Sequence, residues 1–162
     1  MNEVDWYVAH TRPRREKKLA EFCTREVLEY TLPLYSSVKR YRGKTLVFRK
    51  PLFPGYIFLK LDRDSSTKVR QNQHVANLLE VPDQAEFEHQ LADILRALDS
   101  GVEVRLAPEI KVGMRVKIKS GPLRGLEAWV QDRAGLSEVI LRLDFIGQAA
   151  VISIKADELE ET

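Results

Sequence analysis

The residues that most often perform chemistry are few in this chain and lie far apart in its sequence. Gly43-Lys44-Thr45 resembles the end of a phosphate-binding loop, but that loop needs a glycine where the chain has Val38. His10, His74 and His89 have no second histidine or cysteine at the spacing of metal ligands. The sequence therefore predicts neither a nucleotide site nor a metal site, and we expect no cofactor.

Nucleophilic and acid–base catalysis also lack the residues they need. Cys23 falls on the apolar face of a predicted helix, where a thiol usually serves as inert packing. No serine stands in a nucleophile elbow, and Asp62 and Asp64 suit a solvated loop better than an acid–base couple. We therefore expect a binding protein rather than an enzyme.

Charge, in contrast, is concentrated in particular segments of the chain. Over residues 9–50, twelve Lys and Arg face four Glu and leave +8, whereas residues 80–110 carry −6. The formal net charge of the chain is only +2. Concentrated positive charge is the usual footprint of phosphate binding, because neutralising phosphates releases condensed counterions. The basic segment is either a nucleic-acid surface or the solvated face of a helix and a hairpin, and charge alone leaves both open.

Composition excludes several other classes of protein. The 162 residues are 44% hydrophobic and 31% charged, which is typical of globular domains and too apolar for a disordered chain. No apolar stretch reaches the roughly 20 residues of a membrane span, and the acidic start over residues 1–5 is not a secretory signal. A single cysteine suits a reducing compartment, so we expect a cytoplasmic protein.

The elements that position the basic residues follow from periodicity. An aromatic and β-branched run predicts a strand over residues 6–10, and Pro13 suits the first turn of the helix that follows. Residues 38–41 and 45–48 predict the arms of a projecting basic hairpin, because they contain little that could be buried. The apolar face of the helix would be formed by Leu19, Phe22, Cys23 and Val27.

The middle of the chain is more apolar than its start. Residues 56–61 predict a central strand, residues 62–67 a polar loop, and residues 69–80 a short helix and a strand. A further amphipathic helix would present Phe87, Leu91, Ile94, Leu95 and Leu98 on one side.

The predicted central strand carries apolar residues on both of its faces. Tyr56 and Phe58 would share one face, opposite Ile57 and Leu59, because side chains alternate along a strand. The aromatic face is either a binding surface, since aromatic residues dominate binding energies, or a second core face that a helix covers.

The last third of the chain changes its period. Residues 99–109 predict a linker, because their polarity is mixed and Gly101 and Pro108 interrupt them. Beyond the linker, apolar and charged residues alternate, and several short strands within about 50 residues predict a small barrel, since closure removes exposed edges. The sequence therefore predicts one domain over residues 1–98 and a second over residues 110–162.

Three stretches together resemble the NusG family of transcription elongation and antitermination factors. They are Trp6-Tyr7-Val8, the Leu-Phe-Pro-Gly-Tyr-Ile-Phe-Leu run over residues 52–59, and residues 112–125, which are similar to a KOW motif; residues 145–154 resemble the last KOW strands. The resemblance implies an α+β N-terminal domain with a ferredoxin-like or RRM-like fold, in which helices flank a four-stranded antiparallel sheet. A five-stranded KOW β-barrel would follow.

The resemblance also implies binding to RNA polymerase across its DNA cleft. In the family, an apolar concave face grips the clamp helices of the β′ subunit, and a polar segment contacts the gate loop of the β subunit. Such bridging suppresses pausing or termination by favouring the elongating state. By position, the clamp-helix face would be formed by His10, Phe53, Pro54, Tyr56, Phe58, Leu91, Ile94, Leu95 and Leu98. The gate-loop contact would come from Ser65, Ser66 and Thr67.

Upstream and non-template DNA would lie beside the basic residues, and the KOW domain would recruit further partners. By resemblance, the DNA contacts would come from Arg12, Arg14, Arg15, Lys17, Lys18, Arg40, Arg42 and Lys44. The termination factor Rho, or the ribosomal protein NusE, would bind Gly121, Leu123, Arg124, Gly125, Phe145 and Ile146. We expect a monomer without a membrane partner.

Within the family, residues 6–18 look more like specialised, operon-associated antiterminators of the RfaH and UpxY types than like the housekeeping factor. Some of those proteins can refold the KOW domain into helices. Here the period of two over residues 116–119 and 139–143 predicts that the domain stays β. The alternative function is a ribosome-binding or RNA-binding protein that uses its KOW barrel.

Overall fold

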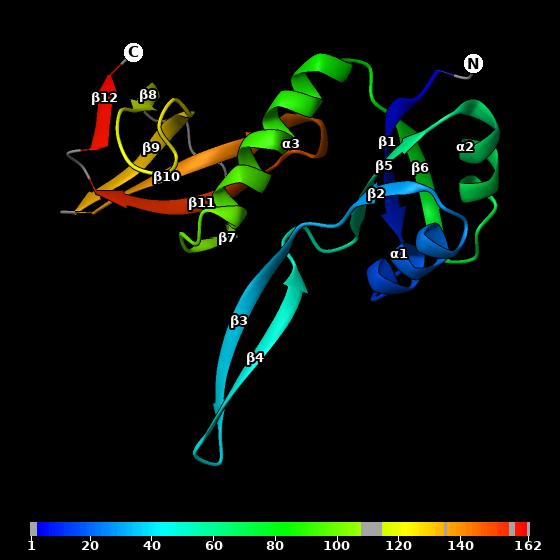
Figure 1. Cartoon of the computed structure of the whole chain (residues 1–162), viewed down its shortest axis with the longest axis horizontal. Helices are drawn as coiled ribbons and strands as arrows, with labels where there is room; N and C mark the ends of the chain where they lie inside the picture. The colour runs from blue at the N-terminus through cyan, green and yellow to red at the C-terminus, as the bar shows by residue number, and fades with distance from the viewer. Residues whose placement is uncertain (1–2, 108–114, 135, 156–157, 162) are drawn as a thin grey trace. The chain divides into compact units, whose positions relative to one another are not determined.

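The computed structural model describes residues 3–107, 115–134, 136–155 and 158–161 (Figure 1). The chain divides into two compact units, Met1–Gln84 and Ala85–Thr162. The predicted first domain ends at residue 98, near the end of helix α3 (Gln84–Asp99). Apart from its first residue, this helix belongs to the second unit. Among the described residues, no helix has the length and apolar character to cross a membrane.

Unit 1 is built on a four-stranded antiparallel sheet. Its strands are β1 (Asp5–Thr11), β2 (Glu29–Thr31), β5 (Tyr56–Leu61) and β6 (Val75–Glu80), in the order β2-β5-β1-β6. The prediction that residues 56–61 form a central strand is confirmed, since β5 pairs with β1 on one side and with β2 on the other.

Two helices, α1 (Glu16–Arg25) and α2 (Arg63–Arg70), pack on one face of this sheet. The core between them and the sheet contains Ala9, Leu19, Ala20, Cys23, Ile57, Leu59, Leu61, Val69, Val75 and Leu78. Val8 and Phe58 project to the opposite face and are also fully buried. Both faces of the central strands are therefore apolar and covered.

The start of α1 differs from its prediction. The helix begins at Glu16, and Pro13 lies in the turn before it, where Arg14 takes a left-handed conformation with φ of 60°. The predicted place of Val27 on the apolar face is wrong, since Val27 lies beyond the helix end and is 90% exposed. Its N–H donates to the carbonyl of Thr24, and that of Leu28 donates to Cys23, which is the Schellman arrangement that ends a helix.

The predicted polar loop over residues 62–67 is wrong beyond its first residue, because α2 begins at Arg63. Asp62 caps the helix: its Oδ1 accepts a hydrogen bond from the N–H of Ser65 at 2.8 Å. The buried side chain of Val69 fixes the helix against the sheet.

Strands β3 (Leu34–Tyr41) and β4 (Lys44–Pro51) form a separate two-stranded hairpin that extends away from the sheet of unit 1 (Figure 1). Its turn places Arg42 and Gly43 at φ of 50° and 76°, as a type I′ turn requires. The arms are longer than predicted, but the projection of the hairpin is confirmed.

Unit 2 is an antiparallel β domain with one helix, α3 (Gln84–Asp99). Its sheet has the order β12-β8-β9-β10-β11-β7. The strands are β7 (Val104–Leu106), β8 (Arg115–Ile118), β9 (Glu127–Ala134), β10 (Leu136–Leu143), β11 (Gln148–Lys155) and β12 (Leu159–Glu161), with a 3-10 turn η1 (Asp144–Ile146) before β11.

The predicted fold class, α+β followed by an antiparallel β domain, is confirmed, with one strand more than the five expected. The additional strand is β7, which comes from the predicted linker and pairs with residues 150–152 of β11. Ile140, Ala149 and Val151 form a core cluster of this unit. Residues 112–114 of the KOW-like stretch lie outside the described residues.

Candidate functional site

The loop over residues 52–55, between the hairpin and β5, is held by backbone contacts. The N–H of Tyr56 donates to the carbonyl of Phe53 at 3.2 Å, and the N–H of Thr11 donates to the carbonyl of Gly55 at 2.8 Å. Gly55 has φ of +87°, a left-handed conformation that favours glycine. The end of β1 therefore fixes this loop.

A buried carboxylate holds the same loop from the helix side. Glu16, the first residue of α1, is 8% exposed and accepts a hydrogen bond from the N–H of Gly55 at 3.2 Å. A negative charge is favourable at this position of a helix. Glu16 was not among the predicted site residues, because the 39 positions between it and Gly55 hide the contact from local sequence patterns.

The predicted apolar binding face contains both accessible and buried residues. The rings of His10 and Tyr56 stack with centroids 5.1 Å apart, and His10 and Pro54 are exposed while Tyr56 is half-buried. Phe53 and Phe58 make an edge-to-face contact at 6.2 Å and are buried. Of these five residues, only His10, Pro54 and Tyr56 are accessible to a partner in this structure.

The helical part of that predicted face belongs to unit 2. On α3, Leu91 and Ile94 are buried, whereas Leu95 and Leu98 are half-buried. Their helical spacing confirms the predicted amphipathic helix.

Ser65, Ser66 and Thr67 lie within α2 rather than in a loop. The hydroxyl of Ser66 is buried and donates to the carbonyl of Arg63 at 2.6 Å, and the exposed Thr67 hydroxyl donates to the same carbonyl at 3.3 Å. Both hydroxyls are therefore engaged inside the helix.

The predicted DNA contacts before and within α1 form one basic cluster. Arg12, Arg14, Lys17 and Lys18 are exposed and Arg15 is half-buried. The Arg12 Nε donates to the carbonyl of Gln73 at 3.1 Å. The Lys17 Nζ donates to the carbonyl of Arg49 at 2.8 Å, which connects α1 to the base of the hairpin.

His74, which was not among the predicted site residues, belongs to the same cluster. Its Nδ1 lies 3.1 Å from the Arg15 Nη1, and since a guanidinium only donates, that nitrogen must accept and lack a proton. Desolvation lowers the pKa of His74, and the positive charges of Arg15, Lys18 and Arg25 lower it further. Part of this lowering of the His74 pKa therefore reflects the positive charge of the cluster.

The hairpin extends the positive surface. Its residues Arg40, Arg42 and Lys44, all predicted DNA contacts, are exposed, and the Arg42 guanidinium lies 5.3 Å from the ring centroid of Tyr41. Residues 34–51 contain six Lys and Arg and no Asp or Glu.

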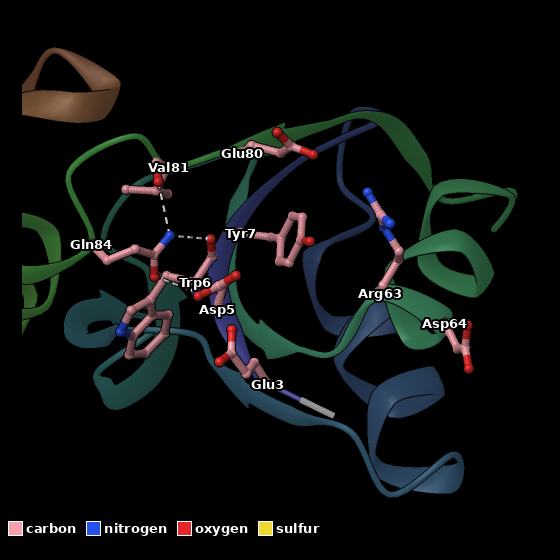
Figure 2. A pocket seen from close by; sticks show the side chains of 9 residues that line it. All are labelled: Glu3, Asp5, Trp6, Tyr7, Arg63, Asp64, Glu80, Val81 and Gln84. Atoms are coloured by element: carbon pink, nitrogen blue, oxygen red, sulfur yellow. Dashed lines mark hydrogen bonds between the residues drawn. The ribbon is translucent and has the colours of Figure 1, made fainter. Parts of the chain in front are cut away.

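The opposite end of the unit 1 sheet is acidic. A cavity of about 620 Å³ lies at the start of β1 and is lined by Glu3, Asp5, Trp6, Tyr7, Arg63, Asp64, Glu80, Val81 and Gln84 (Figure 2). The Gln84 amide accepts from the N–H of Trp6 at 2.6 Å and donates to the carbonyls of Trp6 and Val81 at 3.0 and 2.8 Å. Four carboxylates there repel phosphate, so the end with Arg12 is the one suited to nucleic acid.

Acidic groups do not combine into a metal centre either. Within the parts of the chain that the structure describes, no group of three or more His, Cys, Asp or Glu is placed to hold a metal ion.

The predicted partner residues of unit 2 occupy two loops. Gly121 and Gly125 have φ of +85° and +94°, and between them Leu123 is buried while Arg124 is exposed. In the second loop, Phe145 and Ile146 form part of η1 and are half-buried.

Helix α3 contacts both of these loops. The ring of Phe87 meets that of Phe145 edge to face at 6.3 Å. The Gln90 side chain accepts from the N–H of Asp144 at 2.9 Å and donates to its carboxylate at 2.8 Å. The Arg96 guanidinium donates to the carbonyls of Pro122 and Arg124 at 3.2 and 2.8 Å. Helix α3 therefore contacts both loops of the predicted KOW partner surface, in which Leu123 is buried, Phe145 and Ile146 are half-buried, and Gly121, Arg124 and Gly125 are exposed.

Comparisons with known proteins agree with the geometry. A family model described as transcription termination factor NusG matches residues 4–96. The transcription termination/antitermination protein NusG of Staphylococcus carnosus is 24% identical over 96% of this chain and 94% of its own, and that of Treponema pallidum is 25% identical over 96% and 97%. A solved structure titled "Domain interaction in Thermotoga maritima NusG" has a TM-score of 0.60 and 21% identity, over 98% of this chain and 97% of that chain, and it shares the fold.

Proposed function

Because the chain belongs to the NusG family, we propose that it is a transcription termination/antitermination factor that binds RNA polymerase across its DNA cleft and suppresses pausing or termination. Proteins of this family act by binding and are not enzymes. RNA polymerase, the proposed partner, acts in the cytoplasm of bacteria, and we propose the same location for this protein. We also propose that it is a monomer.

The observation that carries this proposal is the surface at the end of β1. The stacked rings of His10 and Tyr56, with the exposed Pro54 beside them, stand on a loop that Glu16 and Thr11 hold in place. Preformed aromatic surfaces of this kind bind partners at a small cost in conformational entropy. In the proposal this surface contacts the β′ clamp helices, and α2 contacts the β gate loop through Thr67.

Binding at these sites is sufficient for the function, and no chemistry is required. A factor that binds the elongating state of the polymerase more tightly than the paused state shifts the equilibrium by the difference in affinity. A difference of about 1–3 kcal/mol shifts it by about 5- to 150-fold. The basic cluster around Arg12 to Lys18 would add contacts to the phosphates of upstream or non-template DNA, where its positive potential is favourable.

The role of unit 2 in the proposal is to recruit a partner such as Rho or NusE. Both predicted partner loops are in contact with α3 through Phe87, Gln90 and Arg96. A partner that binds Phe145 would therefore compete with α3 for this loop, which links the binding of the second partner to a change within unit 2. Operon specificity, as in the specialised members of the family, is also part of the proposal and rests on residues 6–18.

The proposal is tested by the binding of purified RNA polymerase to the full chain and to its His10→Ala, Tyr56→Ala double variant. Phe58 is unsuitable for this test, because it is fully buried and its loss would destabilise the fold. We expect the double variant to bind at least about 10-fold more weakly, since central aromatic contacts contribute about 2 kcal/mol or more.

Tyr30→Ala is the matched control, because Tyr30 is a ring on the edge strand β2 with 37% exposure and lies outside the proposed surface. Unchanged polymerase binding by the double variant, or equal losses in both variants, would overturn the assignment of this surface. Binding to ribosomal subunits instead of polymerase would favour the alternative function, a ribosome-binding KOW protein.

A further inference from the structure

The hairpin formed by β3 and β4 has two chemically different faces. Directly opposite residues of an antiparallel pair share a face, and the register pairs Tyr41 with Lys44 and Val38 with Val47. The aromatic hairpin face contains Tyr35, Ser37, Lys39, Tyr41, Lys44, Leu46, Phe48 and Lys50. The aliphatic hairpin face contains Leu34, Ser36, Val38, Arg40, Thr45, Val47, Arg49 and Pro51.

The aromatic hairpin face repeats one pattern along its length. Three of its four cross-strand pairs place a lysine opposite a large apolar side chain: Tyr35 with Lys50, Leu46 with Lys39, and Tyr41 with Lys44. The remaining pair joins Ser37 and Phe48. Neighbouring pairs on one face of a strand lie about 7 Å apart, so rings and lysines recur along the whole length of this face.

These rings and apolar side chains are open to solvent. Tyr41 is 60% exposed, Phe48 45% and Leu46 41%, and apolar side chains gathered on one exposed face are typical of an interaction site. The two strands form a sheet of their own and pair with no other strand among the described residues. The exposed rings thus remain available for a partner.

We propose that the aromatic hairpin face binds a single DNA strand, with unpaired bases stacked on Phe48 and Tyr41 and phosphates beside Lys39, Lys44 and Lys50. This inference rests on the proposed function, in which DNA contacts the basic residues of unit 1, and it adds the face of the hairpin and the kind of DNA. Base stacking on aromatic side chains combined with a basic surface is the usual way in which proteins hold single strands.

Charge selects the nucleic acid over a polypeptide as the occupant. The hairpin has six cations and no carboxylate, so it complements a polyanion and would repel most basic protein surfaces. Paired bases in a duplex present their edges rather than their ring faces to a protein, so exposed rings favour an unpaired strand. The aliphatic hairpin face has two arginines but no ring, and it serves as an internal comparison.

The test measures the affinity of the full chain for a fluorescently labelled single strand of about 20 nucleotides and for the matching duplex, from low to moderate salt. Phe48→Ala and Val47→Ala form the matched pair, because they are adjacent in β4, both exposed, and on opposite faces. Phe48→Leu removes the ring but keeps an apolar strand residue, and Phe48→Tyr keeps the ring.

We expect Phe48→Ala and Phe48→Leu to weaken binding of the single strand by about 5-fold or more, which is the lower range measured for one stacked base. Val47→Ala and Phe48→Tyr should change it less than about 2-fold. Duplex affinity should be nearly the same in all four variants. Lys39→Gln should reduce the salt slope on the single strand by about 0.7, the value of one phosphate contact.

Equal losses for Phe48→Ala and Val47→Ala, full affinity in Phe48→Leu, or no binding of the single strand at low salt would overturn the inference. So would a loss of polymerase binding in Phe48→Ala with normal affinity for the single strand, because the face would then contact protein. The proposed function is tested separately: polymerase binding depends on His10 and Tyr56, and either result can fail while the other holds.

Discussion

In unit 1 the loop over residues 52–55 keeps Pro54 at the surface beside the stacked His10 and Tyr56, whereas in unit 2 the loops at 121–125 and 144–146 lie against α3. Both regions were predicted as partner-binding surfaces from the resemblance to the NusG family. The difference is that the rings of the unit 1 surface have no helix packed on them, whereas Phe145 in the unit 2 surface is held by an internal contact with Phe87. This difference shows that a binding motif in a sequence does not reveal whether the folded chain covers it.

The largest expected effect distinguishes a core residue of unit 1, Phe58, from Tyr56 on its proposed binding surface. Phe58→Ala should lower the free energy of unfolding by about 3–5 kcal/mol, because a fully buried ring is replaced by a cavity. Tyr56→Ala, two residues away on the same face, should cost less than half as much. Urea unfolding of both variants checks this, and similar losses would show that the accessible surface and the core are not distinct here.

Glu16→Ala should release the loop that holds the unit 1 surface. A hydrogen bond to a charged group contributes about 1.5–3 kcal/mol, and the low end is expected at 3.2 Å. Hydrogen exchange at the Gly55 amide should become faster by about 10-fold, and Glu21→Ala, an exposed carboxylate on the same helix, should leave it unchanged. If exchange at Gly55 is the same in both variants, Glu16 does not hold the loop.

The cover of unit 2 should be removable without unfolding its sheet. Gln90→Ala combined with Arg96→Ala removes four hydrogen bonds, all at exposed positions, so we expect a loss of about 1–2 kcal/mol in the α3 contact. Exchange at the amides of residues 144–147 should increase while β10 stays protected. Simultaneous loss of protection in β10 would mean that α3 is part of the core of unit 2 rather than a cover.

The smallest expected effect concerns the charge of the unit 1 surface. Removal of a positive charge by Arg15→Gln should raise the pKa of His74 towards its ordinary value of 6.5, although desolvation will keep it lower. In the unchanged chain the folded state binds the His74 proton less tightly than the unfolded state. The free energy of unfolding should therefore decrease as pH falls below about 6.5. NMR titration of the imidazole checks the shift, and an unchanged or lower pKa in the variant would contradict the positive local potential.

Periodicity predicted much of the fold. The strands at residues 6–10 and 56–61, the projecting hairpin and the helix with Phe87 and Leu91 all follow from spacing that each segment carries within itself. Helix α2 was missed because Val69 gives it only one large buried apolar residue, so its period is weak. Val27 was misplaced because the Schellman turn ends α1 two residues earlier.

The features of the site that could not be predicted join distant residues. Glu16 meets Gly55 and Arg15 meets His74 across 39 and 59 positions, and no local pattern marks either pair. The apolar stripe of α3 predicted a helix but not what lies against it. The family resemblance therefore predicted the surfaces, whereas tertiary contacts decided which of their residues are accessible.

The most direct test of the proposed function is single-round transcription by purified RNA polymerase through a defined pause site, with and without the full chain. We expect the chain to shorten the pause several-fold at saturating concentration, and the His10→Ala, Tyr56→Ala variant to do so only weakly. No change in pause lifetime or termination, under conditions where the chain is folded and in excess, would contradict it.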